Sequence, residues 1–311
     1  MSKSASCGIR FSIALLHPRY WLSWLMLSFM FILGQFPTSF RHALGRFIGN
    51  YIYRHKKKRR NIVATNLKIA FPQLDEDARD ELVRKNLQWY ACAMMDYSIL
   101  FFASKHRILK LVQIDGQEHI DKAIKTNQSI IILLAHSAML EFSPVALGSR
   151  FEIFGSYKTS KNALLDWMIA KSRCRFAKFV VSRDEGLRKL VKALSPNRLM
   201  IFLPDEDLGI DNAIFVPFFG KNKATLTTTS RITKMGKAVA LPIFSWYDAE
   251  LKKYRTQVLP ALENYPSKNV EADAKALNNA LEELINQHPE QYMWQMKWYR
   301  TRPEGEPDLY V

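Results

Sequence analysis

The chain has 311 residues, of which 48% are hydrophobic, and it contains only 12 Gly and 13 Pro. This composition predicts a folded protein with a sizeable core and excludes a disordered or fibrous chain. The net charge is +16, but residues 1–60 carry eleven cations and no acid, which leaves 34 cations against 29 acids, a surplus of +5, in the rest of the chain. Such a surplus is small for a nucleic-acid-binding protein of this size, so no nucleic-acid partner is expected.

The three cysteines, Cys7, Cys92 and Cys174, show neither pairing nor metal-ligand spacing. This usage favours a reducing compartment without a disulfide framework, and it excludes zinc and iron–sulfur sites of the usual spacing. We therefore expect no bound metal.

A long apolar run lies near the N-terminus, where no charged residue occurs from Tyr20 to Phe40. At about 1.5 Å rise per residue, a helix over residues 20–36 is roughly 25 Å long, whereas the hydrocarbon core of a bilayer is about 30 Å thick. The run predicts an N-terminal membrane helix that either spans a slightly thinned bilayer or lies in its interface. A cleavable signal peptide is the competing interpretation, but no small-x-small cleavage site follows the run.

A polybasic block follows at residues 54–60, RHKKKRR. Such a block is found on solvated helix faces and in nucleic-acid patches, but beside an apolar anchor it favours attraction to anionic lipid headgroups, at about 1 kcal/mol per cation. If the apolar segment spans, eight cations follow it up to residue 60 against three before it. This asymmetry predicts that the large C-terminal part faces the cytoplasm.

Residues 75–102 show helical periodicity with acids in the first turn, and beyond them short β-rich runs alternate with helical stretches. This alternation predicts an α/β fold in which a mixed sheet is flanked by helices. The expected strands are 129–135, 151–157, 178–182, 199–204, 214–219, 238–245 and 254–259, and the expected helices are 137–147, 162–175, 184–195, 225–236 and 270–287.

The most informative position is His136, which directly follows the buried strand 129–135. Open α/β sheets place their sites at the carboxyl ends of strands, and the helix that follows offers free N–H groups to an anion. Glu141 lies five residues further on and meets the imidazole only if His136 sits in the turn. A carboxylate bonded to one ring nitrogen raises the basicity of the other. The pair therefore predicts a general base, His136, oriented by Glu141.

Two other clusters are candidates for binding. Asp205, Glu206 and Asp207 follow another apolar strand, where acids act as loop caps, metal ligands or orienting groups. Asp-x-Asp also occurs in the manganese site of nucleotide-sugar glycosyltransferases, so a metal-dependent membrane glycosyltransferase using Asp205 and Asp207 is one alternative, and a non-enzymatic lipid-binding scaffold is another. Six cations between the acidic sites would suit phosphate groups: Lys158, Lys161, Lys171, Arg173, Arg175 and Arg183.

The chain resembles the bacterial lipid A late acyltransferases, which are the lauroyl and myristoyl transferases related to glycerol-3-phosphate acyltransferases. Within this family it most resembles the myristoyl branch. The resemblance covers almost the whole chain. It rests on motifs in one order: Arg60–Leu67 with Phe71-Pro72, His136-x4-Glu141, Tyr157 with Asn162, Pro204–Asp207, Val216–Phe219, Pro289–Trp294 and Thr301–Glu306.

The resemblance implies a fold like that of glycerol-3-phosphate acyltransferases, with a membrane anchor over residues 1–44 and an acyltransferase catalytic domain over 45–311. It implies transfer of a fatty acyl chain from acyl carrier protein to a hydroxyl of a 3-hydroxyacyl chain on a lipid A precursor, at the cytoplasmic face of the inner membrane. Membrane lipid is the third partner, and neither cofactor nor metal is needed. His136 and Glu141 are the implied catalytic pair, and Arg173, Arg183 and Asp205 are expected to bind substrate.

Overall fold

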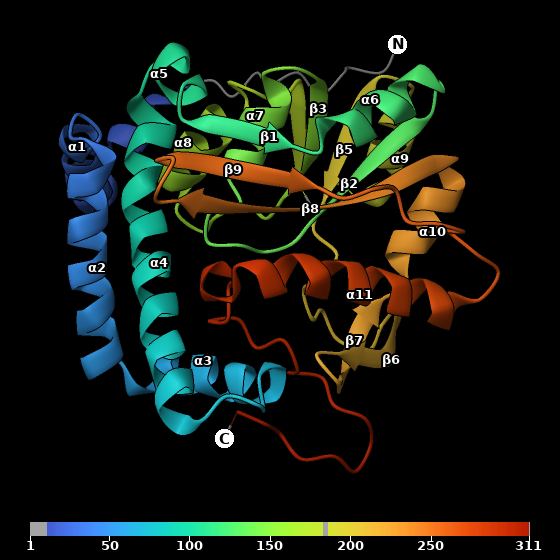
Figure 1. Cartoon of the computed structure of the whole chain (residues 1–311). Coiled ribbons are helices and arrows are strands. Elements are labelled where there is room, and N and C mark those ends of the chain that lie inside the picture. The colour runs from blue at the N-terminus through green and yellow to red at the C-terminus, as the bar shows by residue number, and fades with distance from the viewer. Residues whose placement is uncertain (1–10, 183–185, 311) are drawn as a thin grey trace.

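The computed structural model describes residues 11–182 and 186–310, which fold around a seven-stranded mixed sheet with helices on both faces (Figure 1). Neighbouring strands are parallel except for β8 and β9, which are antiparallel. The mixed α/β sheet predicted from the sequence is therefore confirmed. In order across the sheet, the strands are β1 (Val112–Asp115), β9 (Lys253–Val258), β8 (Ala238–Asp248), β2 (Ser129–Leu134), β5 (Arg198–Phe202), β3 (Glu152–Tyr157) and β4 (Phe179–Ser182).

β2 lies at the centre of the sheet, and all six of its residues are buried. Because side chains alternate across a strand, Ile131 and Leu133 pack into one core and Ile130 and Ile132 into another on the opposite face. In Figure 1, α11 lies below the sheet and α6 and α7 lie above it. The helices around the sheet are α5 (Lys105–Leu109), α6 (Gln117–Lys125), α7 (Phe142–Gly148), α8 (Ala163–Arg173), α9 (Leu187–Ala193), α10 (Thr228–Met235) and α11 (Val270–Gln287).

A group of N-terminal helices stands beside one end of the sheet (Figure 1). Two glycines of α2 permit its close packing on α4, because a Cβ at Gly45 would come within 2.6 Å of the Cys92 Cα, and a Cβ at Gly49 would clash with the backbone of Gln88. Two short 3₁₀ helices, Ile13–Leu16 and Pro18–Tyr20, precede this group. Its helices are α1 (Trp21–Leu33), α2 (Thr38–His55), α3 (Lys57–Ala70) and α4 (Glu76–Phe102), the last matching the helix predicted over 75–102.

The apolar run near the N-terminus forms only the 13-residue helix α1, which ends at Gly34. In the part of the chain that the structure describes, no helix has the length and apolar character needed to cross a bilayer. The structure therefore does not support a spanning helix, which is one of the two forms expected from the sequence. The physical reason is that Gly34 and Pro37 end the helix after about 20 Å, counted at 1.5 Å per residue.

Several other predictions need correction. The helix expected over 137–147 begins only at Phe142, after an irregular segment and a turn. The first residues of the helix expected over 225–236 belong to β7 (Lys221–Leu226), which forms a separate antiparallel pair with β6 (Ala213–Phe218). A hairpin turn with positive φ at Phe219 and Gly220 joins the two strands and decides the pairing.

The expectation that no disulfide forms is also corrected. Cys174 is disulfide-bonded, whereas Cys92 is a buried free cysteine. Cysteine pairing requires Cα atoms within about 7 Å of each other. Spacing along the chain does not reveal which segments the fold brings that close.

Candidate active site

His136 lies at the carboxyl edge of the sheet, two residues beyond the end of β2, and Asp205 lies beside it. β2 and β5 are adjacent parallel strands, so the segments that follow them leave the sheet at the same edge. The backbone N–H of His136 donates to Asp205 Oδ2 at 2.8 Å, and His136 Nδ1 lies 2.6 Å from Asp205 Oδ1. The two residues are 9% and 2% exposed, so this is a buried pair.

The surroundings of Asp205 keep its carboxyl group ionised. Burial raises the pKa of Asp205, but the charge and hydrogen bonds of His136 outweigh burial, so that the pKa lies below its ordinary value. The hydroxyl of Tyr292 adds a further hydrogen bond, 3.0 Å from Asp205 Oδ2. A carboxylate at Nδ1 fixes the proton on that nitrogen and leaves Nε2 as the basic atom of the imidazole.

Glu141 does not make the bond that the sequence analysis predicted for it. The carboxylate that hydrogen-bonds the imidazole is that of Asp205, while Glu141 pairs with Arg173, whose Nε donates to Glu141 Oε2 at 3.1 Å. Glu141 is the N-cap residue of α7, at the end of the turn over 138–141, and this position directs it to α8. Burial alone would lower the pKa of Arg173, but the charge and the hydrogen bond of Glu141, together with Tyr97 and Tyr157, outweigh burial and the pKa is raised.

The sequence analysis also expected free backbone N–H groups for an anion directly after His136, and the described residues do not offer them there. The N–H of Ser137 donates to the carbonyl of Ala135 at 2.8 Å, and the N–H of Ala138 donates to the carbonyl of Gln291 at 2.7 Å. These donors are already used within the protein. The helix starts five residues later than expected, so its own N-terminus is at Phe142.

His136, Glu141 and Arg173 line one cavity of about 300 Å³, together with Lys158 and Tyr97. Asp205 is behind the imidazole and is not among the lining residues. The structure thus brings together a carboxylate-bound imidazole, an arginine–glutamate pair and an exposed lysine at one opening. A hydroxyl group that enters this cavity would meet a base, and a negative charge that develops there would meet two cations.

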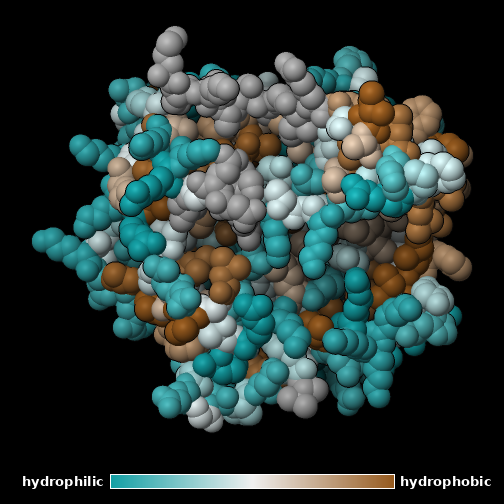
Figure 2. All heavy atoms as spheres, turned by 180° about the vertical axis from the view of Figure 1, so that it is seen from behind, coloured by the Kyte–Doolittle hydropathy of each residue, from teal (hydrophilic) through white to brown (hydrophobic). Residues whose placement is uncertain are grey.

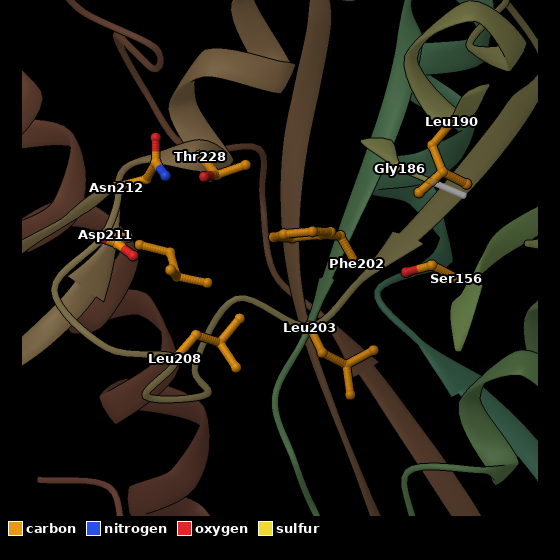
Figure 3. A pocket seen from close by; sticks show the side chains of 10 residues that line it. Ser156, Gly186, Leu190, Phe202, Leu203, Leu208, Asp211, Asn212 and Thr228 are labelled. Carbon is orange, nitrogen blue, oxygen red and sulfur yellow. The ribbon is translucent and has the colours of Figure 1, made fainter. Parts of the chain in front are cut away.

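A second, mainly apolar cavity of about 250 Å³ adjoins the first, because Ser156 and Leu203 line both. Figure 3 shows Phe202, Leu203 and Leu208 around this cavity, with Asp211 and Asn212 at one side. Both cavities are lined mainly by apolar side chains, and the first also carries the polar groups of His136, Glu141, Lys158 and Arg173. This combination suits a substrate with a reactive polar group and a hydrocarbon chain.

Comparison with known proteins agrees with this geometry. A model of the family described as bacterial lipid A biosynthesis acyltransferase matches residues 9–301. The chain belongs to this family. It is 33% identical over 301 residues to a lipid A biosynthesis acyltransferase of Haemophilus influenzae, with 96% of this chain and 94% of that protein covered. It is 32% identical to the lipid A biosynthesis lauroyltransferase of Escherichia coli, with 97% and 98% covered.

The lipid A biosynthesis myristoyltransferase of Escherichia coli is 27% identical over 295 residues, with 94% of this chain and 91% of that protein covered. The identity to the lauroyltransferase is higher, so these comparisons do not single out the myristoyl branch. The family is shown, whereas the length of the acyl chain stays open.

The basic residues that the sequence placed between the acidic clusters do not form one group in this acyltransferase. Lys158 and Arg173 line the cavity, but Lys171 stacks on the ring of Trp167, 4.7 Å from its centroid. Arg175 donates to the backbone carbonyl of Leu100 at 2.9 Å. Arg183, expected to bind substrate, lies outside the described residues.

The metal-dependent alternative finds no support in the positions of its two aspartates. Asp207 accepts hydrogen bonds from the N–H and the hydroxyl of Thr301, both at 2.7 Å, and Asp205 is bonded to His136 and Tyr292. Among the residues that the structure describes, no group of three or more His, Cys, Asp or Glu side chains is placed to hold a metal ion. Asp207 instead fixes the C-terminal segment against the loop after β5.

Sequence reasoning missed two residues of the site. Tyr292 comes from a distant segment, and its backbone pairs with Ser137 in an isolated bridge. Lys223 is only 1% exposed; burial lowers its pKa to about 8, although Asp205 and Asp207 favour its charged form. The sequence analysis did not mark Lys223, because it assigned residues 225–236 to a helix and did not predict the strand β7 that contains this lysine.

Proposed function

We propose that the protein transfers a fatty acyl chain from acyl carrier protein to a hydroxyl group of a 3-hydroxyacyl chain on a lipid A precursor, as a late step of lipid A assembly. The observation that carries the proposal is the buried Asp205–His136 pair beside a largely apolar cavity, next to which lies a second apolar cavity. The family of the chain supports the same class of acceptor.

In this mechanism, His136 Nε2 removes the proton of the acceptor hydroxyl as its oxygen attacks the thioester carbonyl. The carbon–sulfur bond then breaks, and the thiolate of the carrier leaves with the proton that the imidazolium returns. Asp205 holds the imidazole in the tautomer that this step requires and stabilises its positive charge. The substrates themselves supply every atom of the ester and thiol products.

Glu141 and Arg173 form the opposite wall of the cavity, and we assign them a role in shaping it. A charge-assisted pair of this kind keeps the guanidinium at a fixed place in the site. Arg173 then offers positive charge to a phosphate group or to the developing oxyanion. The adjoining apolar cavity is proposed to take the acyl chain.

We also propose that the N-terminal part, within residues 1–44, lies against the cytoplasmic face of the inner membrane. Support comes from α1, where Trp21, Leu22 and Leu25 are 64%, 78% and 68% exposed. Figure 2 shows hydrophobic surface at the side of the molecule where α1 lies. Exposed apolar side chains on a short helix suit burial in the membrane interface.

The proposed function is tested with His136→Ala and purified protein, a defined acyl carrier thioester and a lipid A precursor. Removal of the base is expected to lower the transfer rate by about 10²–10⁴-fold without unfolding the protein. His42→Ala serves as the matched control, because His42 is another buried histidine bonded to an aspartate. A rate for His136→Ala within twofold of wild type would contradict the mechanism, whereas no transfer by wild type would favour a non-enzymatic lipid-binding scaffold.

A further inference from the structure

A third opening lies where α2 and α3 meet. It is a groove of about 730 Å³. Its walls carry a row of cations with a few apolar residues, and no acid is found among the described residues that line it. The lining consists of His55, Lys56, Lys57, Lys58, Arg59, Ile62, Tyr90, Met293, Gln295 and Met296.

This basic groove is joined to the site at His136 through a single residue. Met293 lines both the basic groove and the cavity beside His136. Its backbone N–H donates to the carbonyl of His136 at 2.9 Å. The basic groove and the cavity at His136 are therefore adjacent, close enough for one extended molecule to contact both.

Several cations of the basic groove occupy electrostatically unfavourable positions at the start of α3. Lys57, Lys58, Arg59 and Arg60 form the first turn of α3, which contains no acid. Positive side chains are disfavoured at a helix N-terminus, because the unpaired N–H groups there already carry positive charge. A local preference broken in this way is typical of functional positions, and the accumulated charge attracts an anion.

One of these cations is already held in place. Arg59 donates to the hydroxyl of Tyr90 at 3.1 Å, and its guanidinium lies 5.6 Å from the centroid of the Tyr90 ring. Lys57 and Lys58 also line a further cavity of about 360 Å³ next to the basic groove. These two lysines are therefore at the centre of the basic surface.

We propose that the basic groove binds a phosphate group of the acceptor glycolipid, a proposal that rests on the proposed function. Phosphate matches the cations, and the apolar side chains of Ile62, Met293 and Met296 match the lipid part of the same molecule. An acidic protein surface would need a broad, open face, whereas these cations line a concave groove. The acceptor would thus be held at one end by Lys57 and Lys58 while its hydroxyl reaches His136.

The test uses the full-length protein in non-ionic detergent micelles and two acceptors, the phosphorylated lipid A precursor and the same lipid after its phosphate has been removed. The double variant Lys57→Gln/Lys58→Gln is compared with the control Arg54→Gln/Lys68→Gln. The control removes the same charge from exposed positions of α2 and α3 that do not line the groove. Thermal unfolding of both variants checks that they are folded.

We expect the groove variant to raise the KM for the phosphorylated acceptor by about tenfold or more, with kcat within twofold of wild type and no change for the dephosphorylated lipid. A KM equal to that of the control would overturn the proposal. Equal losses for both acceptors would overturn it in favour of general lipid attraction, and a raised KM for the acyl carrier thioester would overturn it in favour of carrier docking. If wild type transfers no acyl chain, the proposed function fails, and direct binding of the phosphorylated lipid still decides the groove.

Discussion

Two buried histidine–aspartate pairs occur in the described part of the chain, and they differ in what surrounds them. At the sheet edge, His136 Nδ1 lies 2.6 Å from Asp205 and the ring faces a cavity. Between α2 and α4, His42 Nε2 lies 2.7 Å from Asp96, and its ring packs edge-on against Tyr247. The hydrogen bond is nearly the same, so it does not by itself indicate catalysis.

In the second pair, the aspartate also binds a permanently charged arginine. Arg41 donates to Asp96 Oδ1 at 2.9 Å and to the carbonyl of Phe36 at 2.8 Å, and neither Arg41 nor Asp96 is exposed. This network fixes the N-terminal helices to the rest of the protein. The two pairs therefore differ in their access to a cavity, and we expect this access to separate a reactive imidazole from one that stabilises the fold.

The largest expected effect comes from changing the aspartate of each pair in turn. Asp96→Asn should lower the free energy of unfolding by about 3–5 kcal/mol, because Arg41 is left buried without its charged partner. Asp205→Asn should instead lower kcat by about 10²-fold or more, since the imidazole loses the carboxylate that fixes its tautomer. Urea unfolding and initial transfer rates, each measured on both variants, check this division.

The comparison breaks if Asp96→Asn, once folded, transfers acyl chains as slowly as Asp205→Asn. It also breaks if Asp205→Asn keeps the rate of wild type. Either result would mean that access to the cavity does not distinguish the two pairs.

A smaller effect concerns the cation near each aspartate. Arg41 stays charged at any pH at which the protein is folded, whereas burial lowers the pKa of Lys223 from 10.5 to about 8. Between pH 8 and pH 10.5, Lys223 binds more protons in the unfolded chain than in the folded protein. The free energy of unfolding therefore rises with pH over this range, by up to roughly 3 kcal/mol. Below pH 8 the full cost of the buried charge is present.

Lys223→Met should therefore flatten the rise in stability between pH 8 and 10 relative to wild type. Urea unfolding at a series of pH values measures this slope. Parallel profiles for the two proteins would show that Lys223 is not buried as a titrating charge.

The smallest expected effect sharpens the assignment of Glu141. If Glu141 acts through Arg173, then Glu141→Gln and Arg173→Met remove the same pair, and the double variant should be little slower than either single variant, with a coupling energy of about 0.5–3 kcal/mol. Transfer rates of the four proteins give this energy. Additive losses would return Glu141 to a separate role, such as the direct action on His136 that the sequence suggested.

Much of the site could be predicted because it sits at strand ends. Apolar runs before His136 and Asp205 identified two strands, and both residues were placed at the sheet edge for that reason. The partner of His136 was predicted wrongly because Glu141 is near in sequence. Asp205 is 69 residues away, and only the adjacency of β2 and β5 brings it within hydrogen-bond distance.

By itself, the sequence determined the alternation of strands and helices, the candidate base and the family resemblance, since hydrophobic periodicity and motif order are local or linear properties. The tertiary structure decided which carboxylate meets which cation, that the apolar run Tyr20–Phe36 forms only a short helix, and that the polybasic residues line a groove next to Met293. These features depend on which strands are neighbours and how helices pack. Such long-range contacts are set by burial and shape across the whole chain, and no short segment of the sequence specifies them.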